Sequence, residues 1–256
     1  MEVHAHTHTA RKKWAHYFWE FIMLFLAVFC GFLAENQREH FVEDHRAKDY
    51  AKSLLSDLRL DTSELRRATQ QTKHVIAAID RIVSISSKPD RQKTVPGAFY
   101  FYSSLMYYSF QVNWGKSTID QLIQSGNLRY FKNKELVEMI NTYYYMEGVI
   151  SSQNERDAVQ RDKITEIRNG ILLSKYYPLF AQQSDPAGNV LSQANDSLNT
   201  LRFPLQENGE KQIDKYINHL LDRKGRLTNL AGTYYPITTD IGLEIIKTII
   251  EEYKLK

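Results

Sequence analysis

The feature that most constrains this chain is an apolar run near its N-terminus. Residues 21–34 contain no charged and no strongly polar side chain. As a helix these 14 residues would span roughly 21 Å, and including Tyr17 to Glu20 extends the helix to about 27 Å, close to the roughly 30 Å of a bilayer core. Tyr17, Phe18 and Trp19 are aromatic residues of the kind that lie at the headgroup level. We therefore predict a transmembrane helix over 17–34, preceded by a short polar tail over 1–16.

Two other interpretations of this run stay open, a cleaved secretory signal and a buried core helix. Arg11, Lys12 and Lys13 precede the run as basic residues precede the apolar part of a signal. Phe32, however, stands where cleavage after Ala34 would require a small residue. The sequence thus favours an uncleaved anchor.

Basic residues near the run indicate its orientation. Three of them lie directly before the run, and four are spread over the turns that follow it: Arg38, Arg46, Lys48 and Lys52. Because basic residues close to a membrane helix are retained on the cytoplasmic side, the denser N-terminal group favours a cytoplasmic N-terminus. The remaining chain, 35–256, would then lie outside the cytoplasm.

Residues 32–88 contain neither glycine nor proline, so nothing there ends a helix. We predict one long helix over 35–88 that continues from the membrane segment. Its apolar residues recur mostly at spacings of three or four, and the partner of this stripe is either another helix of the same chain or the same helix of a second copy. The stripe comprises Leu54, Leu58, Leu65, Ala68, Thr72, Val75, Ile79 and Ile82.

The rest of the chain predicts further helices. Aromatic-rich helices are expected over 96–126, although the aromatic content of this region is also compatible with a pair of strands. Gly126 suits a helix end, and Asn133 suits the cap of a long helix over 134–176. C-terminal helices are expected over 208–256. The predicted fold class is all-α: an N-terminal transmembrane helix continuing into a long helix, followed by an antiparallel helical bundle.

Small residues form a smooth stripe on the predicted anchor. Ala27, Gly31 and Ala34 fall at positions i, i+4 and i+7, where they would let a second membrane helix pack closely. Small residues are also common in membrane helices that do not associate. The functional interpretation predicts a homodimer through the anchor and the adjacent long helix.

Two blocks of the sequence carry a family resemblance. The segments 18–36 and 50–58 resemble the opening of a family of small uncharacterised bacterial single-pass membrane proteins, and 122–129, 133–136 and the pair Tyr143 and Tyr144 are similar to that family's other recurrent block. The resemblance covers about the first 145 residues. It implies a bacterial single-pass membrane protein and no activity. Together with the basic residues, this predicts an inner-membrane protein with the N-terminus cytoplasmic and the C-terminal body periplasmic.

Composition and motifs exclude several classes of chemistry. One cysteine excludes a disulfide framework, and the 30 basic and 28 acidic residues after residue 34 give no broad basic surface, so we expect no nucleic-acid partner. Phosphate-loop, dinucleotide, nucleophile-elbow and His-Glu-x-x-His motifs are absent from the sequence. His4, His6 and His8 alternate in the tail, where a metal ion would lack supporting residues. We predict no catalytic residue, no cofactor and no metal site.

One group of aromatic side chains is a candidate pocket for a hydrophobic or planar ligand, because tyrosine combines an apolar ring with a polar tip. Helices with these spacings also bury aromatic residues simply as core. The candidate pocket residues are Tyr100, Tyr107, Tyr108, Trp114 and Tyr144.

The sequence is best interpreted as a non-enzymatic, membrane-anchored helical protein with an extracytoplasmic interaction, scaffolding or sensing role and an unidentified protein partner. The alternative is a membrane-tethered carrier or enzyme that uses the tyrosine-rich pocket. A closed pocket with converging polar groups would favour the alternative.

Overall fold

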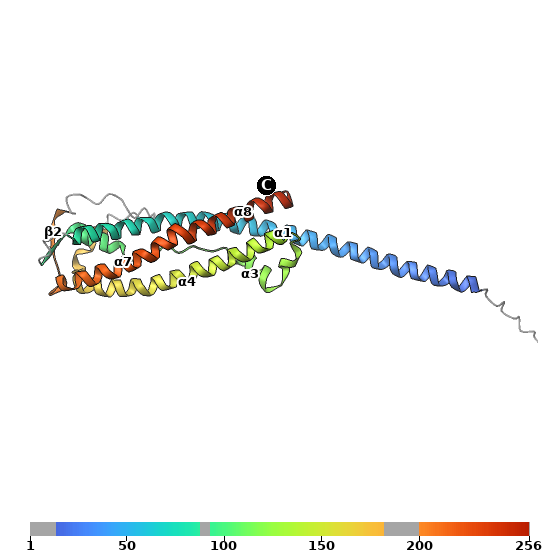
Figure 1. The fold of residues 1–256 in the computed structure, drawn as a ribbon, viewed down its shortest axis with the longest axis horizontal. Helices are drawn as coiled ribbons and strands as arrows, with labels where there is room; N and C mark the ends of the chain where they lie inside the picture. Colours follow the sequence, from blue (N-terminus) through green and yellow to red (C-terminus); the bar gives the residue numbers. More distant parts are fainter. Residues whose placement is uncertain (1–13, 88–92, 182–199, 256) are drawn as a thin grey trace, which may run out of the picture. The chain divides into compact units, whose positions relative to one another are not determined.

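A computed structural model describes residues 14–87, 93–181 and 200–255 of the chain (Figure 1). Most of the predicted tail over 1–16, with His4, His6 and His8, lies outside the described residues. The chain divides into two compact parts, residues 1–50 and 51–256. The second part is called the body, and the two parts are described separately.

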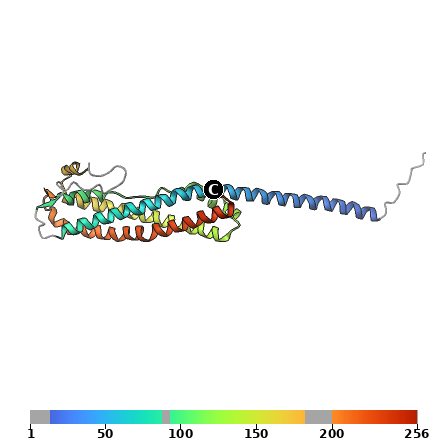
Figure 2. The ribbon, with the colours of Figure 1, turned by 90° about the horizontal axis from the view of Figure 1, so that it is seen from above.

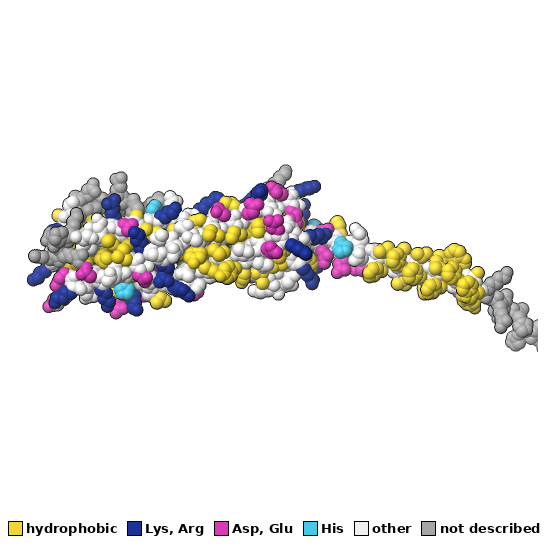
Figure 3. Space-filling model, in the orientation of Figure 1, with side chains coloured by type: hydrophobic (Ala, Val, Ile, Leu, Met, Phe, Trp, Pro, Cys, Tyr) yellow, Lys and Arg dark blue, Asp and Glu magenta, His cyan; other side chains and the backbone are white. Residues whose placement is uncertain are grey.

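Helix α1 runs from Trp14 to Ser86, which confirms that a stretch without glycine or proline continues as one helix. Among the described helices, α1 is the one that is long and apolar enough to cross a membrane, by length and composition. An 18-residue window of it has a mean hydropathy of 2.0, and none of that window is buried. Figure 3 shows its continuous apolar coat. Along this helix the rings of Phe21, Phe25 and Phe29 stack at successive turns.

In its described residues, 51–87, 93–181 and 200–255, the body is a helical bundle with one small two-stranded sheet, in agreement with the predicted all-α class. In the sheet, β1 (Thr94–Pro96) pairs antiparallel with β2 (Arg202–Pro204), with Val95 opposite Phe203. The longer helical elements are α2 (Gly97–Leu105), α3 (Lys116–Gln124), α4 (Lys134–Ile171), α7 (Ile213–Asn229) and α8 (Tyr235–Tyr253). The shorter ones are η1 (Asn127–Tyr130), η2 (Ser174–Tyr176), α5 (Pro178–Ala181), η3 (Gly209–Gln212) and η4 (Leu230–Tyr234), the last a π-helical turn.

Contacts between the long helices fix their directions. Asp61 of α1 contacts Tyr143 of α4, and Thr72, eleven residues further along α1, lines a small cavity with Asn154, eleven residues further along α4. These two helices therefore run parallel. On α8 the order is reversed, since Gly242 packs beside Thr62 and Tyr143 whereas Tyr235 bonds to Asn154. The rod formed by α7, η4 and α8 is thus antiparallel to both other helices (Figures 1 and 2).

The apolar stripe of α1 is part of the body's core. All eight side chains from Leu54 to Ile82 that form it are at most 3% exposed. Of the two partners that the sequence left open, the structure supplies the first, because helices of the same chain cover the stripe. The stripe therefore offers no free surface to a second copy.

Local signals at two helix ends are confirmed. Gly126 adopts φ +67°, a left-handed conformation that glycine accepts without strain, directly after α3. The Asn133 side chain accepts a hydrogen bond of 3.1 Å from the backbone N–H of Leu136 and so caps α4. That helix ends at Ile171, five residues before the predicted end, because Leu172 is extended and bridges to Leu205.

The region predicted as aromatic-rich helices over 96–126 differs most from expectation. Helix α2 ends at Leu105, and α3 begins only at Lys116. The ten residues between them, 106–115, include no helix and no strand, and they return along the bundle from the end of α2 to the start of α3. We call them the return segment. It is this return that lets α4 run parallel to α1.

Candidate functional site

The backbone of the return segment is bonded by charged side chains of the surrounding helices. A peptide segment packed against a core needs hydrogen-bond partners for its N–H and C=O groups. This segment forms no helix or strand whose backbone hydrogen bonds would supply them. The bonds are Arg223 to Met106 O (2.7 Å) and Tyr108 O (2.9 Å), Arg161 to Tyr107 O (3.0 Å), Arg67 to Gln111 O (3.4 Å), and Gly115 N–H to Asp61 (2.7 Å). These four charged side chains, Asp61, Arg67, Arg161 and Arg223, together with Asp157, form what we call the polar seam.

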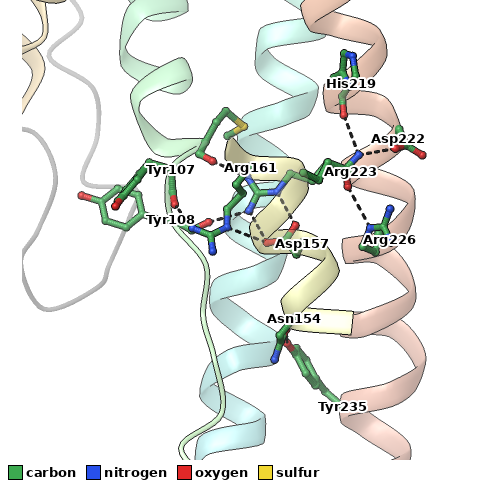
Figure 4. Close-up of polar contacts among 12 residues, drawn as sticks. Tyr107, Tyr108, Asn154, Asp157, Arg161, His219, Asp222, Arg223, Arg226 and Tyr235 are labelled. Atoms are coloured by element: carbon green, nitrogen blue, oxygen red, sulfur yellow. Dashed lines mark hydrogen bonds and ion pairs between the residues drawn. The ribbon is translucent and has the colours of Figure 1, made fainter. Parts of the chain in front are cut away.

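The centre of the polar seam is an ion pair between Arg223 of α7 and Asp157 of α4 (Figure 4). The Arg223 side chain is fully buried, and its Nε and Nη2 donate to the two carboxylate oxygens at 2.8 and 3.1 Å. Arg161 adds a second cation, with its Nε 3.2 Å from Asp157 Oδ2. Burying such charges is costly, and the cost is offset here because the Arg223 guanidinium donates to both Asp157 oxygens and to two backbone oxygens.

Space beside this ion pair is almost completely filled. The cavity that borders Asp157, Arg223 and Tyr235 has a volume of about 10 Å³, on the order of one water molecule. Tyr235 donates to Asn154 Oδ1 at 3.4 Å, and burial raises the pKa of its phenol to about 12. Leu230, the first residue of the π-helical turn η4, also lines the cavity. The centre of the seam is therefore packed rather than open to a ligand.

A second cluster lies where the return segment meets α3. Asp61 is 4% exposed and accepts from Gly115 N–H and, at 3.2 Å, from the Tyr143 hydroxyl. Burial, together with the nearby carboxylates of Glu147 and Asp57, raises the pKa of Asp61 from its ordinary 3.8 to about 6. Burial and the Asp61 charge likewise raise the pKa of Tyr143, so its phenol stays a neutral donor. This carboxyl therefore holds its proton to a higher pH than an ordinary aspartate does.

The same cluster holds the first turn of α3, which has no side-chain cap of its own. Asp57 accepts from Thr118 N–H at 3.4 Å, and Lys116 forms an ion pair with the buried Glu147. A Cβ atom at Gly115 would lie 3.0 Å from the Cβ of Asp57, so the close approach of the return segment to α1 favours glycine there. Carboxylates of α1 thus serve as the N-terminal cap of α3.

The five candidate pocket residues do not come together. Tyr100 is buried among Tyr176, Tyr177, Phe180 and Phe203, and its hydroxyl donates to Pro204 O at 2.7 Å. Trp114 meets the edge of Tyr143, and Tyr108 stacks on Phe110. Tyr107 and Tyr144 are 62% and 40% exposed. For Tyr107, Tyr108 and Trp114 the physical reason is the return segment, which leaves the helical path after Leu105 and so scatters side chains that a continuous helix would have aligned.

The three small residues of the predicted anchor remain open on the surface of α1. Ala27, Gly31 and Ala34 are exposed, and an added Cβ at Gly31 would meet no atom within 4 Å. The neighbouring Cys30 is a free, exposed thiol. Packing of this face against another membrane helix stays a prediction.

Sequence reasoning missed the polar seam, although α4 carries a signal for it. Its core-facing series includes Glu147, Asn154, Asp157 and Gln160, all buried. Polar residues at core spacing indicate a buried partner that needs hydrogen bonds. Among the described residues, no group of three or more His, Cys, Asp or Glu side chains is placed to hold a metal ion.

Replacing Asp157 should destabilise the body strongly. In Asp157→Ala the buried Arg223 guanidinium loses its counter-charge, so we expect the free energy of unfolding to fall by about 3–5 kcal/mol. Chemical denaturation of the full chain, followed by circular dichroism, measures this change. The control Asp162→Ala, at an exposed position of the same helix, should change stability by no more than about 0.5 kcal/mol. Equal effects of the two substitutions would contradict the role given to the ion pair.

Stability should depend on pH through Asp61. Because its folded pKa of about 6 lies above the ordinary 3.8, the folded state holds the proton more tightly, and the stability gained from protonation is lost as pH rises through about 6. Asp61→Asn removes this loss. The unfolding free energy of the variant minus that of the unchanged chain should therefore increase between about pH 4 and pH 7 and then level off.

Denaturation series at several pH values test this expectation. Asp80→Asn is the matched control, since Asp80 is exposed on the same helix and pairs with Lys224. The control should not show the increase. A difference between Asp61→Asn and the unchanged chain that is flat with pH would refute the assignment.

Comparison of the chain with protein-family models, curated proteins and solved structures gave no match.

Proposed function

We propose that this chain is a bacterial single-pass membrane protein without enzymatic activity, whose helical body lies in the periplasm and serves interaction, scaffolding or sensing. The observation that carries the proposal is the apolar section of α1, whose 18-residue window of mean hydropathy 2.0 has no buried residue. A soluble protein would bury such a surface. Insertion in a bilayer removes the same surface from water.

The packing of the body supports an interaction role over catalysis or transport. A carrier or an enzyme needs an enclosed cavity with converging polar groups. The cavity at the centre of the polar seam has room for about one water molecule, and Arg223 beside it donates to the Asp157 carboxylate and to a backbone oxygen. The tyrosine-rich alternative gains no support, because its five residues lie apart.

Topology mapping in bacteria tests the proposal. The full-length chain is treated with protease in intact cells, in cells with a permeabilised outer membrane, and in cells whose inner membrane is lysed. We expect the body to be digested once the outer membrane is opened, and the undigested chain to have its full-length mass and to resist extraction from membranes. A cytoplasmic protein serves as the control for inner-membrane integrity.

Two outcomes would contradict the proposal. Digestion only after lysis of the inner membrane would reverse the orientation. A mature mass that lacks the first 34 residues would indicate a cleaved signal and an exported protein without an anchor.

We also propose that two copies of the anchor form a parallel homodimer, and disulfide crosslinking through Cys30 tests this. Cys30 borders the face formed by Ala27, Gly31 and Ala34, and it is exposed. Mild oxidation of membranes should give a reducible dimer, and Gly31→Leu should diminish that dimer because a large side chain separates the helices. As a control, Phe25→Cys in a Cys30→Ser background moves the thiol to the opposite face. Crosslinking of both thiols to the same extent would mean random collision rather than a dimer.

A further inference from the structure

A row of basic residues runs along the solvent-facing side of α1 in the body. Seven positions follow one another at alternating spacings of four and three, and the structure leaves all seven exposed. They are Lys52, Ser56, Arg59, Ser63, Arg66, Gln70 and Lys73. We call them the basic ridge. It carries four cations and no acid.

The cations of the basic ridge recur every seven residues. Seven residues are two helical turns, so the cations are about 10.5 Å apart and the row from Lys52 to Lys73 is about 32 Å long. Each interval between them holds a serine or a glutamine rather than a large side chain. The row is therefore one residue wide and turns around the helix axis by only about 20° for every seven residues, so that a partner helix crossing at a shallow angle can follow it.

Within the described residues, three of the ridge cations differ from the neighbouring Arg67 in making no ion pair. Arg67, beside the row, pairs with Glu64 at 2.7 Å. In the part of the chain that the structure describes, Arg59, Arg66 and Lys73 make no ion pair. The acids of this section of α1 point elsewhere: Asp57 and Asp61 bond to α3 and to the return segment. Three unpaired charges in register are available to an external anion.

One end of the basic ridge borders a groove of about 420 Å³. Lys52 and Arg59 line it together with two leucines, Leu55 of α1 and Leu255 near the end of the chain. This combination offers an apolar floor between cations. A partner that follows the ridge can place an apolar side chain there.

We propose that the basic ridge is the docking surface for an acidic helix of a partner protein, with Glu or Asp at every seventh position and an apolar residue that enters the groove. A helix with an acid at every seventh position repeats its charges at the same 10.5 Å interval, and two helices packed at a shallow angle keep such rows in register over several turns. The negative charges of an anionic bilayer are spread over a plane, and a row of cations one residue wide would contact only a narrow strip of that plane. The proposal deepens the interaction role proposed above and names its partner by chemistry.

Peptide binding to the full-length chain tests the proposal. The chain is placed in nanodiscs of zwitterionic lipid, and the probe is a labelled helical peptide of four heptads with one glutamate per heptad and one terminal leucine. An isomeric peptide has its glutamates at every fifth residue, which scatters them around the helix. Fluorescence anisotropy should show that the heptad peptide binds about tenfold or more tightly than its isomer.

Matched triple variants locate the site. Exposed ion pairs contribute about twofold to fivefold each, so Arg59→Gln, Arg66→Gln and Lys73→Gln together should weaken binding by roughly tenfold or more. The control carries Lys134→Gln, Lys163→Gln and Lys215→Gln, three exposed lysines of α4 and α7, and so loses the same charge. It should change the affinity less than about twofold. Circular dichroism checks that both variants remain folded.

Several results would overturn the proposal. They are absence of binding, equal affinity for the two peptides, and equal loss in the two triple variants. Tighter binding of duplex DNA or of phosphatidylglycerol vesicles through the same three residues would replace the acidic helix with a different anion. None of these results depends on which side of the membrane the body occupies, so they are distinguishable from a failure of the topology experiment.

Discussion

The body depends on one requirement, that a peptide segment lying along a helical bundle must have hydrogen-bond partners for its backbone. Residues 106–115 have no ladder of their own, and arginine and aspartate side chains from α1, α4 and α7 bond to them instead. This requirement explains why Arg223 and Asp157 are buried where a bundle ordinarily holds leucine. The same segment allows α4 to run parallel to α1, so the order of helices and the polar seam have a common cause.

The elements that sequence predicted well are those decided by local chemistry. Apolar spacing located the stripe of α1, Gly126 and Asn133 marked helix ends, and the absence of glycine and proline over 32–88 predicted an unbroken helix. Each of these signals depends on residues within a turn or two of one another. The membrane interpretation of 17–34 has the same local origin, and the exposed apolar coat of that section agrees with it.

The return segment and the polar seam could not be predicted in this way. The aromatic residues from Phe99 to Phe110 have helical spacing throughout, yet the helix ends at Leu105. What ends it is a guanidinium more than a hundred residues further along the chain, which bonds to Met106 O and Tyr108 O. Buried polar positions on α4 indicated that some such partner exists, but they carried no information on which segment it is. Three of the five aromatic residues grouped as a pocket, Tyr107, Tyr108 and Trp114, lie apart for the same reason.

The bonds of the return segment have a consequence for how the body forms. The side-chain contacts that hold its backbone join residues 44 to 117 positions apart in sequence. Closing loops of this length costs chain entropy before the contact can stabilise anything, so proteins rich in such contacts fold more slowly than simple bundles. We therefore expect residues 106–115 to become ordered after α1, α4 and α7 have assembled around them. On this expectation, the last part of the body to reach its native conformation is the one on which the parallel arrangement of α1 and α4 depends.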